Sequence, residues 1–485
     1  MRWSDRHWLA LILAVYLLLG GLYAIYTPAW QAPDEPAHYN YVRQLAEQGD
    51  LPVMGPGDYP AAYLEQLKAA RFPGSMPIDS LRYEGWQPPL YYVLAAPVYR
   101  LWGGALLPLR LFSVALGAGV VLMTYAIGRA ACPGDRLLAL GAAAFVAFVP
   151  MQLAIVASVN NDALTELLVA GVALRLLGWL SRPGRPARWL VVTGFLLGLG
   201  LVTKASVYYT ALPLALVALW LVERRPGPLL AQGATLLAPA ALVAVPWFAR
   251  NLALYGWPDL LGKLNHDQVV AGQLRTADYL SQVGWPAYLV DFATTTFRSF
   301  WGQFGWMGVP MDRRLYVALG MVSALAVAGC ALLAWRRRAA PGGEIARSQP
   351  SRYPVVLLIL WLAFAAGGYL YYNISFVQFQ GRYLFPALAP TGLLAVAGWR
   401  ALLSRRGSGV GAGVSGLIAA GGALSSRWTG SFDKWLVGAG LGTALALVIR
   451  RWLPAGWDGW PVVAILAGLA GLAGYSLFAF IMPNL

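Results

Sequence analysis

Charged residues and cysteines are scarce in this sequence of 485 residues. Only 12% of the residues are charged, 59% are hydrophobic, and two are cysteines. Soluble domains carry about 25% charged residues, so this composition excludes a chain of soluble domains. Cys132 falls in a gap between apolar runs and Cys330 within one. The sequence therefore predicts neither an outer disulfide nor a cysteine-based metal site.

Long apolar runs take the place of polar surface, and the mean hydropathy is +0.58. A bilayer core about 30 Å thick needs about 20 apolar residues per helical span. We predict an all-α polytopic membrane protein with about 13 transmembrane helices, within a range of about 11 to 14. The expected spans are residues 9–26, 109–128, 137–157, 163–180, 189–203, 205–222, 228–249, 313–335, 354–372, 383–403, 408–424, 434–450 and 460–481.

Lysine is rare as well, since the net charge of +15 comes from 32 arginines and four lysines. Basic pairs and triplets occupy every second gap between the expected spans, including Arg129/Arg136, Arg224/Arg225, Arg405/Arg406 and Arg450/Arg451. By the positive-inside rule these gaps and the N-terminus are cytoplasmic. The basicity is then a mark of topology, and 16 of the 21 acidic residues fall outside or near the outer boundary.

Two outer loops, 27–108 and 251–312, are the longest polar stretches. Residues 88–102 within the first loop are apolar, but they are short and hold Arg100, tyrosines and Trp102, so we predict an interfacial helix. Residues 1–403 form the expected main transmembrane module. Residues 404–485 form a glycine-rich group of C-terminal helices that is expected to pack through small side chains. The first span lacks a small-x-small cleavage site after it, so we expect it to stay as an anchor.

Acidic residues open the first outer loop, in residues 31–42 (QAPDEPAHYNYV). The pattern predicts a short helix that runs to Gln48 and stops at Gly49, with Asp34 at its N-cap. One interpretation is that Asp34 only caps the helix. The alternative is catalytic, because Glu35 and His38 lie in the same turn, and adjacent carboxylates at a membrane edge are costly unless they are used.

A second acidic site, Asp162, begins the helix after the third span, in residues 158–166 (SVNNDALTE). It too could serve as a cap. The predicted topology nevertheless puts Asp162 and Asp34 on the same side of the membrane at similar depth, as two loops lining one cavity would be.

Three cations fall on the same, less basic side: Lys204, Arg250 and Arg382. An arginine fork suits a phosphate, so these residues are candidates for an anionic ligand. The alternative for each is snorkelling or an ion pair with Asp162, Glu166 or Glu35.

Aromatic residues gather in the second outer loop around Trp301, where they could stack on a sugar ring or form part of an interfacial belt. His266 in the same loop could bind a metal together with Asp34 or Glu35, although an isolated loop histidine is more often simply exposed. We predict no required metal or other cofactor, with a divalent metal as the alternative.

Several short motifs occur in the order typical of one enzyme class. They are residues 34–35 (DE), 87–92 (QPPLYY), 161–164 (NDAL), 301–306 (WGQFGW) and 380–386 (QGRYLFP). In these motifs the chain resembles the GT-C membrane glycosyltransferases, in particular the protein O-mannosyltransferases and the aminoarabinose transferases of lipid A. It is most similar to an uncharacterised bacterial branch of that clan. The resemblance covers about residues 1–400, and Gln87 stands where many relatives carry His or Lys.

The resemblance implies an inverting glycosyltransferase in a bacterial cytoplasmic membrane. It would move a sugar from a polyprenyl-phosphate carrier to an acceptor hydroxyl of an envelope glycan, lipid or protein on the outer face. Asp34 would be the base, with Glu35 and Asp162 as further acidic site residues. The candidates for binding the substrate or the lipid phosphate are Lys204, Arg250, Arg382, Gln380, Tyr383, His38, Gln87 and Trp301.

Two rival functions fit many of the same features. A transporter or flippase of an anionic lipid would also use a basic outer pocket, but transporters usually keep their polar residues near the membrane midplane. A polyprenyl-diphosphate-dependent oligosaccharide transferase would bind two phosphates and a divalent metal.

Overall fold

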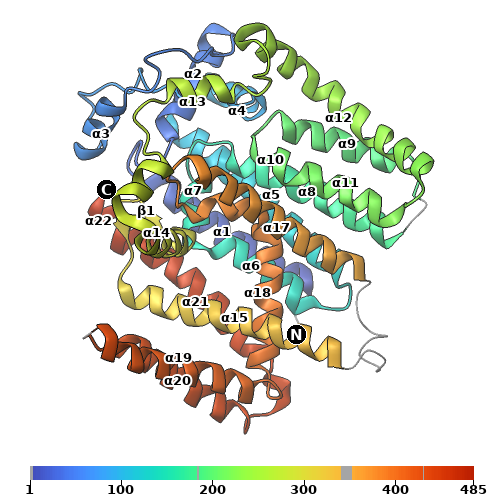
Figure 1. Cartoon of the computed structure of the whole chain (residues 1–485), viewed down its shortest axis with the longest axis vertical. Helices are drawn as coiled ribbons and strands as arrows, with labels where there is room; N and C mark the ends of the chain where they lie inside the picture. The colour runs from blue at the N-terminus through green and yellow to red at the C-terminus, as the bar shows by residue number, and fades with distance from the viewer. Residues whose placement is uncertain (1–3, 183–184, 340–351, 430) are drawn as a thin grey trace.

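The computed structural model describes residues 4–182, 185–339, 352–429 and 431–485, and most of these residues are helical (Figure 1). One short ribbon pairs β1 (Gln303–Phe304) antiparallel with β2 (Val309–Pro310). The helices of the first half are α1 (Asp5–Tyr26), α2 (Glu35–Gln48), α3 (Ala61–Ala69), α4 (Leu90–Leu101), α5 (Leu106–Ala131), α6 (Arg136–Phe148), α7 (Pro150–Val156), α8 (Asp162–Ser181), α9 (Arg188–Leu201), α10 (Ser206–Tyr209), α11 (Ala211–Val222) and α12 (Pro226–Tyr255). The second half contains α13 (Lys263–Val269), α14 (Thr276–Trp301), α15 (Arg313–Ala339), α17 (Arg352–Ser375), η1 (Gly381–Ala387), α18 (Leu388–Leu403), α19 (Ser408–Thr429), α20 (Lys434–Arg450), η2 (Ala455–Trp457), α21 (Trp460–Ser476), η3 (Leu477–Ile481) and α22 (Met482–Asn484).

The chain is a multi-pass membrane protein. Among the described residues, nine helices are long and apolar enough to cross a membrane, and α6 with α7 makes a tenth if this pair, bent by 63°, is one span. Each of the 13 expected segments contains a helix, but the count of 13 is not confirmed. The shortfall arises because α9, the α10–α11 segment and the 17-residue α20 are short for a span.

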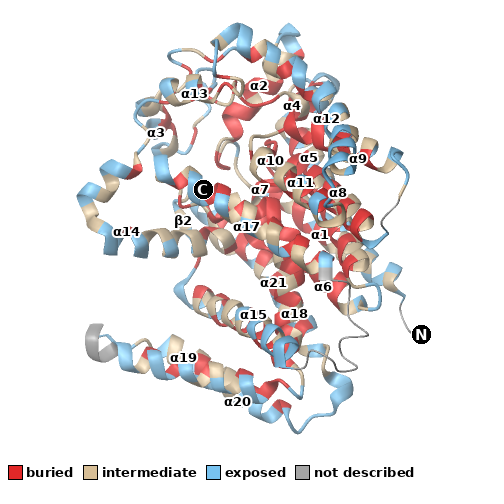
Figure 2. Ribbon diagram, turned by 45° about the vertical axis from the view of Figure 1, so that its right-hand side comes forward, coloured by how far each residue is buried: buried red, intermediate tan, exposed pale blue. Residues whose placement is uncertain are grey.

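The core lies where α5, α6, α8 and α18 pack together, as the red ribbons in Figure 2 show. Glycine permits a close helix crossing between α15 and α18. A Cβ atom on Gly329 would lie 1.9 Å from the backbone oxygen of Gly398, and one on Gly398 would lie 2.0 Å from that of Ala326. This crossing fixes α18, which continues directly from η1.

The first outer loop is folded into α2, α3 and α4. As predicted, α2 ends where Gly49 adopts a left-handed conformation, with φ of 83°. Helix α4 has 12 residues, about 18 Å at 1.5 Å per residue, which is too short to cross a bilayer. Helix α3 was not predicted by the sequence pattern.

The second outer segment, predicted as a loop, instead contains α13 and α14. Helix α14 has 26 residues and bends at Gly284, where φ is 75°. Its C-terminal part packs against η1, so it supports the chain just before α18.

The C-terminal helices differ from one another in their surroundings. Helices α19 and α20 form a hairpin at the edge of the molecule, largely tan and pale blue in Figure 2. Helix α21 packs against α6 inside the bundle, and the Tyr23 hydroxyl of α1 donates a hydrogen bond to the Ala473 carbonyl at 2.8 Å.

Candidate active site

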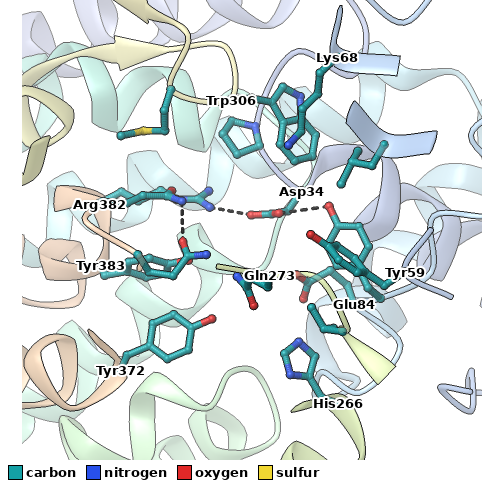
Figure 3. Close-up of a pocket in the computed structure, with 17 residues that line it drawn as sticks. Asp34, Tyr59, Lys68, Glu84, His266, Gln273, Trp306, Tyr372, Arg382 and Tyr383 are labelled. Carbon is teal, nitrogen blue, oxygen red and sulfur yellow. Dashed lines mark hydrogen bonds and ion pairs between the residues drawn. The ribbon is translucent and has the colours of Figure 1, made fainter. Parts of the chain in front are cut away.

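A cavity of about 190 Å³ lies where the two outer segments meet η1 (Figure 3). Drug-sized ligands usually occupy about 300–1,000 Å³, so this cavity suits a smaller group. Its walls are polar and aromatic. They are formed by Pro33, Asp34, Tyr59, Leu64, Lys68, Tyr83, Glu84, His266, Val270, Gln273, Trp306, Met307, Tyr372, Gln378, Gln380, Arg382 and Tyr383.

Asp34 lies at the N-cap position of α2, as predicted, but its side chain faces the cavity. Its backbone is left-handed, with φ of 67°, a conformation that aspartate adopts more readily than most residues. Oδ2 accepts a hydrogen bond from Arg382 Nη2 at 2.6 Å, and Oδ1 accepts one from the Tyr83 hydroxyl at 3.2 Å. The side chain keeps 25% of its surface exposed. These bonds engage both carboxylate oxygens in the cavity rather than at the helix terminus.

The charge of Asp34 is stabilised in this position. Burial raises its pKa, but the nearby positive charges, chiefly the charge and hydrogen bond of the Arg382 guanidinium, together more than offset this effect and hold the pKa of Asp34 below its usual range. The charge of Lys204 acts in the same direction. Asp34 is therefore a carboxylate across the physiological pH range, able to accept a proton.

Arg382 is held in place by η1 and by its neighbour Gln380. Arg382 Nε donates to Gln380 Oε1 at 2.7 Å, and the Gly381 N–H donates to Ser299 Oγ of α14 at 2.7 Å. Position 381 needs glycine, because a Cβ atom there would lie 2.4 Å from the Thr296 carbonyl oxygen. The motif at 380–386 thus sets the close packing that aims Arg382 at Asp34.

A second ion pair lies beside the cavity, where α8 begins. Lys204 Nζ is 2.5 Å from Asp162 Oδ1, and each side chain is about one-fifth exposed. Asn160 Oδ1 accepts a hydrogen bond from the Asp162 N–H at 2.9 Å, at the start of α8. The carboxylate of Asp162 faces Lys204. The ion-pair alternative raised for Lys204 is therefore realised in this structure, with Asp162 as its partner.

Glu35 points away from the cavity, although it follows Asp34 directly. Its carboxylate is fully buried and receives Arg110 Nε at 2.7 Å and Nη2 at 2.6 Å. The backbone N–H groups of Trp30 and Val159 donate to it at 3.1 and 3.2 Å. Arg110 also donates to the carbonyls of Ala24, Thr27 and Pro28. Glu35 therefore holds α1, α2, α5 and the segment before α8 together, and the structure gives it a scaffold role in place of the predicted catalytic one.

His38 and Gln87 lie behind the cavity in the packing of α2 against α4. His38 Nδ1 is 2.8 Å from the Tyr92 hydroxyl. Burial lowers the pKa of His38 to about 3, and the positive charge of Lys204 adds to the shift, so the imidazole is neutral at pH 7. Gln87 Oε1 accepts from Asn161 Nδ2 at 3.4 Å and its carbonyl from Tyr41. Through these contacts, His38 and Gln87 connect α2 with residues 87–92 and 161–164 around the site.

Arg250 and Trp301 do not reach the cavity wall. Arg250 Nη2 donates to the carbonyls of Leu51 and Pro52 at 3.2 and 2.7 Å, which ties the end of α12 to the first outer loop. Trp301 is 4% exposed and packs in the core against Phe145 and Phe300. The aromatic residue of this segment that lines the cavity is Trp306, five positions later.

Several cavity residues were missed by the sequence analysis. Glu84 is the most informative, because burial raises its pKa to about 8 and the charge of Asp34 adds to the shift. Its Oε2 has no hydrogen-bond partner in the described part of the chain. Lys68 lies 4.7 Å from the Trp306 ring centroid, at the opposite wall. The signal that could have indicated Glu84 is its position just before the motif at 87–92.

Among the described residues, no group of three or more His, Cys, Asp or Glu side chains lies close enough together to hold a metal ion. His266 lines the cavity, and its Nδ1 is 2.9 Å from Asp267 Oδ1. His266 and Asp34 therefore face the same space, although they are not in contact.

The site combines the Asp34 carboxylate, which can accept a proton, with aromatic cavity walls. Two cations, Arg382 in the wall and Lys204 beside it, can hold an anion. The fold that carries this site is also found in solved structures of membrane transferases, in agreement with the resemblance noted from the motifs. The chain belongs to the DUF2142 family of predicted membrane proteins, whose sequence profile matches residues 81–390.

Solved structures with this fold include ArnT from Cupriavidus metallidurans, bound to undecaprenyl phosphate. It is 18% identical with a TM-score of 0.55, over 98% of this chain and 78% of that one. The oligosaccharyltransferase AglB from Archaeoglobus fulgidus, in complex with an inhibitory peptide and a dolichol-phosphate, is 13% identical with a TM-score of 0.51. That match covers 98% of this chain, which spans 56% of the length of AglB. Comparison with curated protein sequences finds none that matches the chain.

Proposed function

We propose that the chain is an inverting glycosyltransferase of the bacterial cytoplasmic membrane. It takes a sugar from a polyprenyl-phosphate carrier at the outer face and transfers it to the hydroxyl of an envelope glycan, lipid or protein. The observation that carries the proposal is the Asp34–Arg382 pair, which sets a carboxylate and a cation side by side in a small polar cavity.

The transfer needs both charges. When the acceptor oxygen bonds to the anomeric carbon, the bond from that carbon to the phosphate oxygen breaks and the phosphate leaves with the electron pair. Positive charge develops on the sugar and negative charge on the phosphate, which preorganised cations can stabilise. The acceptor proton moves to the Asp34 carboxylate. The low pKa of Asp34 makes it a weak base, so the proton moves late, once bond formation has acidified the hydroxyl.

We assign Arg382 and Lys204 to the lipid phosphate. Each is paired with a carboxylate here, at 2.6 and 2.5 Å, so donor binding exchanges part of these pairs for contacts with phosphate oxygens. Gln380 orients Arg382, and Asp162 orients Lys204. Because Arg250 donates to loop carbonyls, we assign it a structural role.

The sugar would occupy the polar cavity between the two outer segments. Trp306 and Tyr383 offer aromatic faces to a sugar ring, and Gln273 and Gln378 offer amide groups to its hydroxyls. All these residues lie within 1–403, so we propose this part of the chain as the catalytic module. The proposed reaction requires no metal.

The test is label transfer from a panel of radiolabelled polyprenyl-phosphate sugars to a membrane extract, with detergent-purified wild type and Asp34→Asn. We expect transfer from one donor by the wild type only, with unchanged donor binding by the variant. Transfer by Asp34→Asn would contradict the role of Asp34. Binding without consumption of any donor would favour an anionic-lipid transporter, and dependence on a diphosphate donor with loss of activity in EDTA would favour an oligosaccharide transferase.

A further inference from the structure

An apolar groove lies at the opposite end of α1 from Asp34. Helix α1 has 22 residues, so about 33 Å separate its two ends. The groove has a volume of about 730 Å³ and is bounded by α1, α6 and α21. It is therefore separate from the proposed active site.

The groove exists because α1 and α21 meet only along part of their lengths. Near the outer end, Tyr23 bonds to the Ala473 carbonyl and a Cβ on Gly474 would lie 3.7 Å from Leu19. Toward Asp5 and Trp460 the groove opens between the two helices, with α6 as its floor. Gly141 and Ala144 leave this floor without large side chains, which deepens the groove, while Phe148 lies at its inner end.

The length of the groove along α6 is similar to the thickness of the hydrocarbon layer of one leaflet. Its floor runs along α6 from Arg136 to Phe148, about 18 Å at 1.5 Å per residue. Half of a hydrocarbon core is about 15 Å thick. Trp8 and Trp460 line the groove near its mouth and are both exposed, as tryptophans at headgroup depth are.

A cationic pocket adjoins the mouth of the groove. It is lined by Ser4, Asp5, Arg6, Arg129, Pro133, Gly134 and Arg136, and Arg136 belongs to both surfaces. Three arginines and one carboxylate line the pocket, and the carboxylate, Asp5, pairs with Arg129 at 3.2 Å and also with Arg136. The pocket therefore keeps two net positive charges, beside an apolar groove whose length is similar to the thickness of one leaflet.

We propose that this surface binds an anionic glycerophospholipid of the leaflet at the arginine-rich end of the bundle. The phosphate headgroup would lie against Arg6, Arg129 and Arg136, and an acyl chain would fill the groove between α1 and α21. Basic pockets between transmembrane helices recognise anionic headgroups in this way, and each arginine contributes about fivefold to affinity. The lipid closes the space that α1 and α21 leave over α6.

The experiment is native mass spectrometry of the full chain in detergent with equal amounts of phosphatidylglycerol and phosphatidylcholine. We expect the wild type to retain phosphatidylglycerol preferentially. Ala467→Trp fills the groove and should remove the bound lipid, whereas Ala464→Trp, on the same helix outside the groove, should not. Arg6→Gln should lower the preference about fivefold, and Arg406→Gln, an exposed arginine outside the pocket, should leave it unchanged.

Equal retention of both lipids by the wild type would overturn the proposal. So would equal effects of each variant and its control, since that would indicate lipid bound elsewhere on the surface. A change in oligomeric state with Ala467→Trp, without any change in bound lipid, would show that a second copy of the chain covers the groove instead. Unfolding temperatures measured without added lipid show that the variants are folded.

Discussion

Asp34 and Glu35 are neighbours in the chain, and each forms an ion pair with an arginine, yet the two pairs differ in almost every other respect. Asp34 meets Arg382 through one close contact and keeps a quarter of its surface open to the cavity. Glu35 meets Arg110 through two contacts, receives two backbone N–H bonds and is fully buried. The partly exposed pair therefore suits the proposed chemistry, and the fully buried pair, with its further hydrogen bonds, suits a scaffold.

Backbone geometry separates the two side chains. Successive residues of an α-helix point about 100° apart, so adjacent acids at a helix start diverge. The left-handed conformation of Asp34 increases the difference, because it turns that residue out of the helical path. The two adjacent acids, which suggested a catalytic pair in the sequence, therefore lie in different surroundings. Asp34 lines the cavity, and Glu35 is buried against Arg110.

The largest expected effect is on turnover by Asp34→Asn. Asparagine also tolerates the left-handed backbone, so the variant loses little besides the charge. Loss of a general base costs about 100-fold to 10,000-fold in rate, and we expect that loss in kcat with a smaller loss of thermal stability than in Glu35→Gln, because Asp34 is partly exposed. A stability loss as large as that of Glu35→Gln would erase the distinction between the two pairs.

Glu35→Gln should act on stability instead. Removal of one partner of a buried ion pair costs about 3–5 kcal/mol, because it leaves the charge of Arg110 uncompensated. The measurement is the unfolding temperature of purified protein, with Glu65→Gln as the control for an exposed carboxylate. If folded Glu35→Gln kept its stability but lost transfer, the scaffold role would be wrong.

Glu84 extends the comparison to a third carboxyl and predicts a pH dependence. Burial raises its pKa from the ordinary 4.5 to about 8, so between these values the folded state holds a proton that the unfolded state has released. Its contribution to stability is fully present below about pH 4.5 and is lost as the pH rises to about 8. We expect Glu84→Gln to flatten the fall in unfolding temperature between pH 5 and 8, whereas an unchanged slope would contradict the raised pKa.

The smallest effect is expected from Arg250→Gln. Since Arg250 contacts loop carbonyls outside the cavity, its loss should leave KM for the lipid donor unchanged and lower stability slightly. Arg382→Gln is the matched comparison and should raise KM. Equal increases in KM for the two variants would instead show that Arg250 takes part in binding the phosphate, as the sequence analysis predicted.

The helical architecture could be predicted from the sequence because apolar runs and arginine clusters act locally. Gly49 ends α2 as expected, and residues 90–101 form a short helix. Helices α3 and α14 were missed, because both mix polar and apolar residues and are stabilised by packing against other segments. The number of spans stayed open, since short helices such as α20 fall near the length limit.

The candidate site residues that lie in short sequence motifs could be predicted. Asp34, Arg382, Gln380 and Tyr383 line one cavity, although positions 34 and 382 are 348 residues apart. Glu84, just before the motif at 87–92, and Trp306, at the end of the motif at 301–306, were missed, because only tertiary packing of the outer segments brings them to this space. Local charge also gave no indication that Arg110, within an expected span, would bind Glu35.

The sequence separation of the two ion pairs sets an order for biosynthesis. Glu35 and Arg110 are 75 residues apart, so both have emerged once the second long span is made. Arg382 is synthesised 272 residues after Arg110. At about 5–20 residues per second this is a delay of roughly 15–50 s. During that interval the nascent protein can already anchor its first outer helix, while Asp34 still lacks its cationic partner, so the proposed active site is completed only after most of the membrane domain has been synthesised.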